Sequence, residues 1–209
     1  MLDLIMALKK TNKPRPRDAE ATRQRLLAAA TEEFSGHGFA GARIDRIAHR
    51  SGTNKRMIYA YFGDKDRLFE AVMERLIADL TEGIHFSAEN LSETALSRFD
   101  YMLANPRVRR LAAWRKFERG EPTPAERESY KVRLAAIAAA QRAGKVNDSM
   151  PAAEIFAMVL ALSESWLNAP PTLHAVSTDP LGARRLAEHR KALVEAVRRI
   201  TDPHYRTRR

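Results

Sequence analysis

The spacing of apolar residues constrains the fold of this chain more than any other feature of its sequence. Apolar side chains recur every three or four positions, as they do on one face of an α-helix, and no segment shows the alternation typical of a β-strand. Prolines and glycines separate these periodic segments. The pattern predicts an all-α protein of about nine helices, at about 18–36, 43–50, 55–61, 64–80, 91–104, 107–118, 124–143, 151–168 and 181–201.

Charge and composition narrow the classes of partner. The formal net charge of +10 favours a polyanion, either nucleic acid or an anionic membrane surface. No apolar run approaches the roughly 18–20 residues that span a bilayer, so we expect no membrane partner. The chain has no cysteine, which suits a reducing cytoplasm, and its six histidines lack metal-ligand spacing. We therefore expect neither a metal site nor a cofactor.

The segment ARIDRIAHRSGTNKRMIYAYF, residues 42–62, has the form of a helix-turn-helix. Two short helices are joined by a turn of three or four residues that contains a glycine. The second helix is short enough to enter a major groove, and its first turn carries Lys55 and Arg56. Tyr59 and Tyr61 lie nearby and can donate hydrogen bonds to phosphates or stack on sugars and bases. The segment is therefore predicted to contact DNA.

Capping and charged residues around this segment support the same interpretation. Asn54 is a good N-cap for the second helix, Asp64 can cap the helix that follows, and Ile58 and Phe62 are expected to face inward. A short helical hairpin with a solvated basic face is the alternative. The cationic residues of the region are Arg43, Arg46, Arg50, Lys55, Arg56, Lys65 and Arg67, and its carboxylates are Asp45, Asp64 and Asp66.

From Leu26 to Phe69 the sequence resembles the DNA-binding domain of the TetR (tetracycline repressor) family. The match runs through LLAAATEEF and GHGF, RIDRIA, SGTN, KRMIYAYF and GDKDRLF, with the spacing of that family. The resemblance implies a homodimeric transcription regulator, a repressor that a small-molecule effector releases from double-stranded, palindromic operator DNA. Three positions depart from the family pattern: Ala42 replaces Thr or Ser, Thr53 replaces Val, and Arg56 replaces Gly.

The resemblance also assigns roles to individual residues. The missing hydroxyl at Ala42 would remove a helix cap and a phosphate contact, so Arg43 is expected to hold that phosphate. A basic arm precedes Asp18 and either enters a minor groove or remains a solvated tail. The expected phosphate contacts are Arg43, Tyr61 and Lys65; the residues nearest to bases are Lys55, Arg56, Met57 and Tyr59; Asn54 suits either role; and the arm carries Lys9, Lys10, Lys13, Arg15 and Arg17.

The C-terminal helices suggest a dimer interface and a ligand cavity. The helix at 151–168 is apolar nearly all round, which predicts burial on more than one side, one of them against a second subunit. The helix at 181–201 carries one apolar stripe and is expected to complete a four-helix interface; the alternative is that both helices are core elements of a monomer. The stripe consists of Leu186, Leu193, Val197 and Ile200, and the side chains expected to line a cavity, or otherwise the core, are Tyr101, Met102, Trp114, Phe117, Phe156 and Trp166.

These observations predict three regions: a flexible basic arm at 1–17, a three-helix helix-turn-helix domain at 18–80, and a helical dimerisation and ligand-binding domain at 81–209. The predicted function is that of a cytoplasmic, DNA-binding transcription regulator. Two alternatives remain. One is a DNA-binding scaffold of the same fold that engages a protein partner instead of an effector. The other is a helical enzyme, for which the sequence shows no recognisable catalytic motif.

Overall fold

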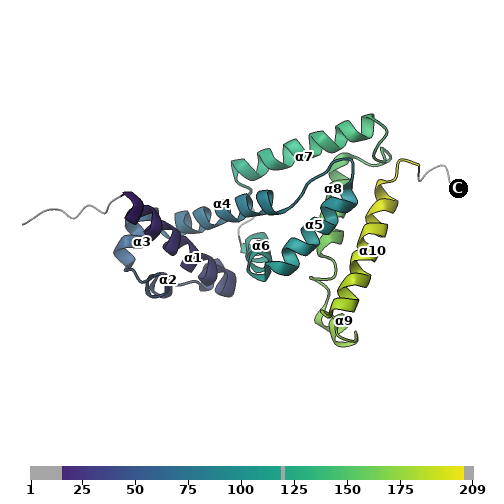
Figure 1. Ribbon diagram of the computed structural model, residues 1–209. Helices are drawn as coiled ribbons and strands as arrows, with labels where there is room; N and C mark the ends of the chain where they lie inside the picture. The colour runs from purple at the N-terminus through teal and green to yellow at the C-terminus, as the bar shows by residue number, and fades with distance from the viewer. Residues whose placement is uncertain (1–15, 119–120, 205–209) are drawn as a thin grey trace, which may run out of the picture. The chain divides into compact units, whose positions relative to one another are not determined.

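Helices account for all of the regular secondary structure in the computed structural model of the chain, which describes residues 16–118 and 121–204 (Figure 1). Within these residues there are ten helices and no strand, which confirms the predicted all-α fold. The helices are α1 (Pro16–Gly41), α2 (Ile44–Ser51), α3 (Lys55–Phe62), α4 (Lys65–Gly83), α5 (Leu91–Ala104), α6 (Pro106–Glu118), α7 (Pro124–Arg142), α8 (Ala152–Glu164), α9 (Pro171–Ala175) and α10 (Ala183–Thr201).

The main departure from the predicted elements lies between α8 and α10. The helix expected to reach residue 168 ends at Glu164, and the short helix α9 follows after two consecutive prolines. Pro171 occupies the first turn of α9, where a missing N–H costs no helical hydrogen bond. A helix of five residues completes little more than one turn, so its sequence shows no apolar period.

Helix α1 continues past its predicted end and is interrupted at Gly38. The backbone there has φ 66° and ψ −179°, a conformation that residues with a side chain rarely adopt. The interruption brings Phe39 next to Phe34, and both rings pack edge-on against Phe69 of α4 with centroids 5.2 and 5.0 Å away. The glycine therefore sets the position of an aromatic cluster in the N-terminal core.

The chain divides into two compact units, the first ending at Val72 and the second beginning at Met73. This division falls inside α4, whereas the domain boundary predicted from the sequence lies at residue 80. The first unit packs α1, α2 and α3 around the beginning of α4. Its buried apolar residues include Leu26, Ala30, Phe34, Ile47, Ile58, Phe62, Leu68 and Phe69.

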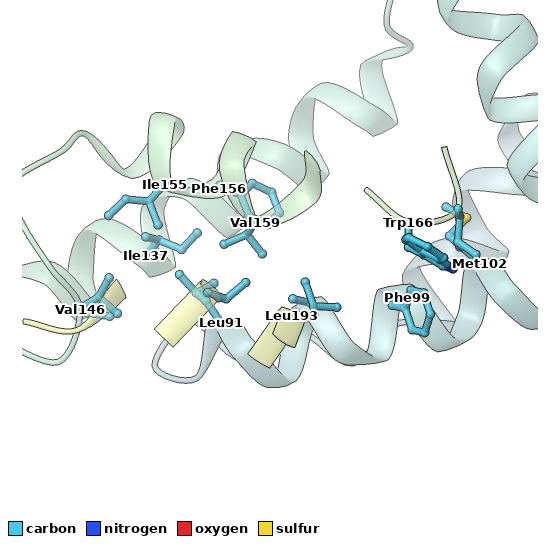
Figure 2. Packing of buried hydrophobic residues seen from close by; sticks show 14 residues of the cluster. Leu91, Phe99, Met102, Ile137, Val146, Ile155, Phe156, Val159, Trp166 and Leu193 are labelled. Carbon is cyan, nitrogen blue, oxygen red and sulfur yellow. The ribbon is translucent and has the colours of Figure 1, made fainter. Parts of the chain in front are cut away.

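The core of the second unit lies where α5, α8 and α10 pack side by side, with α7 against α8 (Figure 1). Figure 2 shows Phe99, Met102 and Trp166 gathered at one end of this cluster, with Ile137 and Ile155 toward the other. Within the ranges 16–118 and 121–204, none of the helices has the length and hydropathy needed to cross a membrane.

The apolar stripe of α10 contributes to this intramolecular core. Leu193 and Val197 are buried, and Leu186 and Ile200 pack against the cluster from its edge. The stripe therefore pairs with neighbouring helices of the same chain, as predicted. Because α5 and α8 cover this stripe within the chain, the expected four-helix interface would use other faces of α8 and α10.

Candidate nucleic-acid interface

The turn between α2 and α3 is set by a glycine in the left-handed region. Gly52 has φ 65° and ψ 30°, and its conformation lets the N–H of Thr53 reach the carbonyl of Ala48 at 3.0 Å. The hydroxyl groups of Thr53 and Ser51 are also hydrogen bonded, at 2.8 Å. A residue with a Cβ would be strained at position 52, so the glycine of the motif is required by the backbone.

Capping side chains begin the two helices that follow, as predicted. Oδ1 of Asn54 accepts a hydrogen bond from the N–H of Met57 at 3.0 Å, and Oδ1 of Asp64 accepts one from the N–H of Arg67 at 2.8 Å. Because the carbonyl oxygen of Asn54 serves as the cap, its NH₂ group is the part of the amide that can donate to DNA.

Helix α3 separates a buried face from an exposed face. Ile58 and Phe62, one turn apart, are 0% and 8% exposed and anchor the helix to the core, as expected. Lys55, Arg56 and Tyr59 lie on the exposed face, and the phenol of Tyr59 is 48% exposed. Among the other predicted contact residues, Arg43 and Asn54 are exposed and Met57, Tyr61 and Lys65 are half-buried.

Two of the candidate cations already have neighbours. The ammonium of Lys55 pairs with the carboxylate of Asp45, with 2.5 Å between Nζ and Oδ1, and both side chains are exposed. The Nζ atom of Lys65 lies 4.7 Å from the ring centroid of Phe39, a cation–π arrangement. Lys65 is therefore held close to the aromatic cluster of the N-terminal core.

A buried carboxylate positions the start of α2. Oε1 of Glu33, which is fully buried, accepts hydrogen bonds from the N–H of Arg43 at 3.0 Å and from Nε of Arg46 at 2.6 Å. The same guanidinium donates to the carbonyl of Gly41 at 2.8 Å. Burial acts to raise the pKa of Glu33, but the hydrogen bonds from Arg46 and Arg43, together with the charges of Arg46 and His37, lower it below its ordinary value.

Glu33 and Arg46 therefore form a structural pair that motif analysis did not identify. The signal was present, since Glu33 falls between Ala30 and Phe34 on the buried side of α1. Arg46, counted among the basic residues of the segment, directs its guanidinium to a carboxylate of its own chain. Its contribution to α2 is to hold the N-terminus of that helix in place.

The residue that caps α2 is Arg43, and the expectation for Ala42 is wrong. Arg43 has the extended backbone of an N-cap, φ −123° and ψ 128°, and its carbonyl accepts from the N–H of Arg46. Its side chain makes no capping hydrogen bond among the described residues. Ala42 is 4% exposed, so a hydroxyl there would lie in the core instead of at a helix end. The missing cap therefore belongs to position 43.

The second unit contains a cavity of about 530 Å³. Its walls come from the C-terminal half of α4 and from α5, α6, α7 and α8, and they are apolar toward α4 and α8 and basic toward α6 and α7. Phe156 is the predicted ligand-binding residue that the structure brings to this cavity. Sequence analysis did not single out Arg98, Tyr130 or Arg133, which also line it.

The other predicted cavity residues lie elsewhere. Met102 and Trp166 are buried in the core cluster; Nε1 of Trp166 donates to a backbone carbonyl at 2.8 Å, and the guanidinium of Arg185 lies 3.9 Å above its ring. Trp114 is 36% exposed on α6, and Tyr101 is half-buried beside α4. The side chain of Phe117 lies outside the described residues, as do residues 1–15 of the arm predicted at 1–17, whose last two residues begin α1.

Comparison with known proteins identifies both units. Residues 26–72 match the family described as bacterial regulatory proteins, tetR family, and residues 90–199 match the tetracyclin repressor-like C-terminal domain. The chain is 35% identical to the HTH-type transcriptional repressor SCO4008 of Streptomyces coelicolor, over 89% of this chain and 98% of that protein. It is 31% identical to the HTH-type transcriptional repressor Rv3405c of Mycobacterium tuberculosis, over 90% and 94% of the two chains.

A solved structure has a similar fold. The crystal structure of SCO4942 from Streptomyces coelicolor is similar to this chain with a TM-score of 0.78 and 33% sequence identity. The similarity covers 86% of this chain and 98% of that one.

Proposed function

The chain belongs to the TetR family of bacterial transcription regulators, and on that premise we propose that it is a homodimeric repressor that leaves a palindromic operator when a small molecule occupies the cavity of its second unit. Family membership itself makes the chain a DNA-binding regulator and not an enzyme. The residues that support operator binding, dimerisation and effector release lie on α3, on α8 and around the cavity. A regulator of bacterial DNA works in the cytoplasm, where that DNA lies.

The exposed face of α3 is the observation that carries the DNA-binding proposal. Its first turn carries Lys55 and Arg56, and Tyr59 follows one turn later on the same face. A helix that fits the major groove directs such residues at base edges, and Arg pairs well with the O6 and N7 atoms of guanine. We assign Arg56 to a base and Lys65, at the start of α4, to a phosphate.

The remaining predicted contacts fit the same division. Met57 and Lys55 extend the base-facing surface of α3, and Tyr61 can donate its hydroxyl proton to a phosphate. Arg43 precedes α2 with an exposed side chain, so its guanidinium suits a phosphate beside the groove. Asn54 can donate a hydrogen bond from its amide to a base or to a phosphate. Phosphate contacts fix the register of the protein on the duplex, and base contacts select the sequence.

The outward face of α8 supports a homodimer. Ile155, Phe156 and Val159 are buried within the chain, whereas Ala157, Met158 and Ala161 are exposed. Small and unbranched side chains let a second helix approach closely, and their burial would remove an apolar surface from water. We propose that two copies pair through this face and the adjacent exposed face of α10, because a two-fold protein matches a palindromic site.

The cavity supports effector binding. Its volume of about 530 Å³ falls in the range of small-molecule sites, and its wall combines apolar side chains with a few polar ones. A ligand that binds one arrangement of the dimer more tightly than another shifts the population toward the arrangement that it prefers. If that arrangement binds the operator less well, the ligand lowers operator affinity, and the operator lowers ligand affinity by the same factor.

Selection of bound fragments from random duplex DNA tests the proposal. We expect a palindromic sequence, a complex of two chains per site by light scattering, and loss of selection with Arg56→Ala. Fragments without two-fold symmetry, or one chain per site, would contradict the homodimer. The alternative of a scaffold is favoured if a broad ligand screen leaves both the melting temperature and the operator affinity unchanged while DNA binding is intact.

A further inference from the structure

One wall of the cavity in the second unit is apolar and large enough to contact a small molecule. Three side chains come from one face of α4, and the others come from the connection after it and from α8. The ring of Phe156 packs edge-on against Phe86, with centroids 6.0 Å apart, and lies tilted against Tyr130 at 5.8 Å. These residues offer a surface for a hydrocarbon or aromatic body. The apolar wall comprises Leu76, Ile77, Leu80, Phe86, Phe156 and Leu160.

The rest of the wall is strongly basic. Among the described residues that line the cavity there are five cationic side chains and one carboxylate, that of Glu126. Glu126 pairs with Arg115 at 2.6 Å, so its charge is already matched within the wall. The cationic residues are Arg98, Arg115, Lys116, Arg127 and Arg133.

Two of these cations are held by neutral groups. The guanidinium of Arg133 donates to the hydroxyl of Ser129 and lies 5.7 Å from the ring centroid of Phe86. That of Arg127 donates to the carbonyl of Pro122 at 2.8 Å. Neither the Ser129 hydroxyl nor the Pro122 carbonyl carries a charge. Arg133 is half-buried next to the aromatic part of the wall, so it lies where the polar end of a ligand would leave the apolar surface.

Arg98 of α5 lines the same cavity and adds another cation to its wall. One of its terminal nitrogens pairs with Glu164 of α8, which fixes the guanidinium. Its Nε atom is buried and has no hydrogen-bond partner among the described residues. A buried donor without an acceptor is costly, and a bound anion that drew the guanidinium toward the cavity would give this donor a partner.

We propose that the ligand of this cavity is an amphipathic anion, with an apolar body against α4 and α8 and a single carboxylate or phosphate near Arg133 and Arg98. This inference rests on the proposed function, since it names the class of effector. A buried carboxylate or phosphate is stable only when it is paired, and arginine pairs with both through charge-assisted hydrogen bonds. A cationic amphiphile of the same size would place its charge among like charges.

Four probes that share a ten-carbon chain and differ in the head group test the proposal: decanoate, decyl phosphate, 1-decanol and decyltrimethylammonium. Isothermal titration calorimetry of the full chain without DNA gives their affinities directly. We expect at least one anion to bind about tenfold more tightly than decanol, and the cation to bind most weakly. The tighter of the two anions identifies the head group as carboxylate or phosphate.

Matched variants locate the head group. Arg133→Gln is expected to weaken binding of the preferred anion about tenfold and to change decanol affinity by less than about twofold. Arg142→Gln, on the exposed end of the same helix and outside the cavity, is expected to change neither. If Arg133→Gln lowers the melting temperature strongly, Arg127→Gln is tested in its place. Arg127 also lines the cavity, but its side chain is exposed, so its replacement should disturb the fold less.

The proposal is overturned if decanol or the cation binds as tightly as the anions, if none of the probes binds, or if the anion preference survives both cavity variants. The failure of the proposed function looks different. If the anions bind with the expected preference but operator affinity stays unchanged, the proposed ligand class is correct and the proposed effector release is wrong. If a neutral or cationic probe binds and releases the operator, the proposed effector release is correct and the proposal of an anionic ligand is wrong.

Discussion

Oε1 of the buried Glu33 lies 2.6 Å from Nε of Arg46 and 3.0 Å from the backbone nitrogen of Arg43. One carboxylate thereby holds both the first turn of α2 and a charged side chain of that helix against α1. Since α2 packs against α3, this contact also fixes the helix that carries the proposed base contacts.

Glu33→Gln is therefore expected to lower both stability and DNA affinity. The amide keeps the shape but loses the charge, which leaves Arg46 without a counterion. We expect a loss of about 1–3 kcal/mol in the free energy of unfolding and weaker binding to any duplex. Urea unfolding and binding titrations measure the two effects. Glu70→Gln, an exposed change of the same kind on α4, is the control, and equal behaviour of the two variants would contradict the assigned role.

Asp45→Asn is expected to strengthen DNA binding. Asp45 pairs with Lys55 in the free protein at 2.5 Å, and both are exposed, so the pair contributes little to stability. Its carboxylate would lie close to the phosphates that the helix-turn-helix approaches. Removing that charge is expected to improve affinity for random duplex by about 1 kcal/mol, or roughly fivefold. Asp148→Asn, an exposed change of equal charge in the second unit, should leave the affinity unchanged.

Lys65→Ala and Arg56→Ala are expected to weaken DNA binding in different ways. Without Lys65, operator and random duplex should both bind less well, and the salt dependence should fall by about one unit per subunit, because each subunit loses one phosphate contact. Without Arg56, the operator should lose about 1–3 kcal/mol per half-site and random duplex little.

Titrations at several salt concentrations on both duplexes measure this difference. Because Lys65 also lies over Phe39, the melting temperature of Lys65→Ala must be compared with that of the parent chain. Equal losses on both duplexes for Arg56→Ala would make it a phosphate contact and leave specificity to Lys55, Met57 and Tyr59.

Ala161→Arg on the exposed face of α8 is expected to give a monomer. An arginine placed between two helices loses its hydration without gaining a partner, at a cost on the order of 2 kcal/mol or more per subunit. Light scattering at micromolar concentration should show the change. Ala135→Arg, exposed on α7, is the matched control and should remain dimeric. If Ala161→Arg dimerises as well as its control, the interface lies on another face.

His189 is expected to make stability fall as the pH is lowered. Burial lowers its pKa below the ordinary value of 6.5, and the charges of Arg185 and Arg190 act in the same direction. Its ring packs 4.8 Å from that of Phe99, and Nε2 has no hydrogen-bond partner among the described residues. The unfolded chain therefore takes up a proton near pH 6.5 that the folded chain takes up only at lower pH.

The contribution of His189 is complete above about pH 6.5 and decreases as the pH falls toward the folded-state pKa. Urea unfolding over a series of pH values should show this slope in the parent chain and a smaller slope in His189→Gln. His49→Gln, an exposed histidine in the first unit, should keep the parental slope. Parallel slopes for all three proteins would show that His189 does not cause the effect.

The helix-turn-helix was predictable because its signals are local. Gly52 supplies the left-handed residue of the turn, Asn54 caps α3, and Ile58 and Phe62 form its buried face. Each of these features depends on residues that are close together in the sequence. The position of the α2 cap was missed by one residue. Arg43 gives no sign of a cap in the sequence, because its backbone takes that role without help from its side chain.

The cavity was less predictable because its residues are decided by packing between distant helices. An aromatic residue on an apolar face satisfies the same periodicity whether it faces a core or a cavity. Met102 and Trp166 are covered by α8, α10 and the segment between them, whereas Phe156 reaches the cavity from the same cluster. Periodicity alone also does not show that a half-buried arginine such as Arg133 borders a cavity.

The burial of Trp166 and the partial exposure of Trp114 have a practical consequence. The chain contains two tryptophans, and both belong to the second unit. Intrinsic fluorescence excited at the red edge of indole absorption therefore reports on that unit alone, while the first unit is silent. The indole of Trp166, enclosed beneath Arg185, gives a blue-shifted signal for the folded core, and the more solvated Trp114 lies one residue from a cavity cation, Arg115. The chain thus carries its own optical label for the part that would bind an effector.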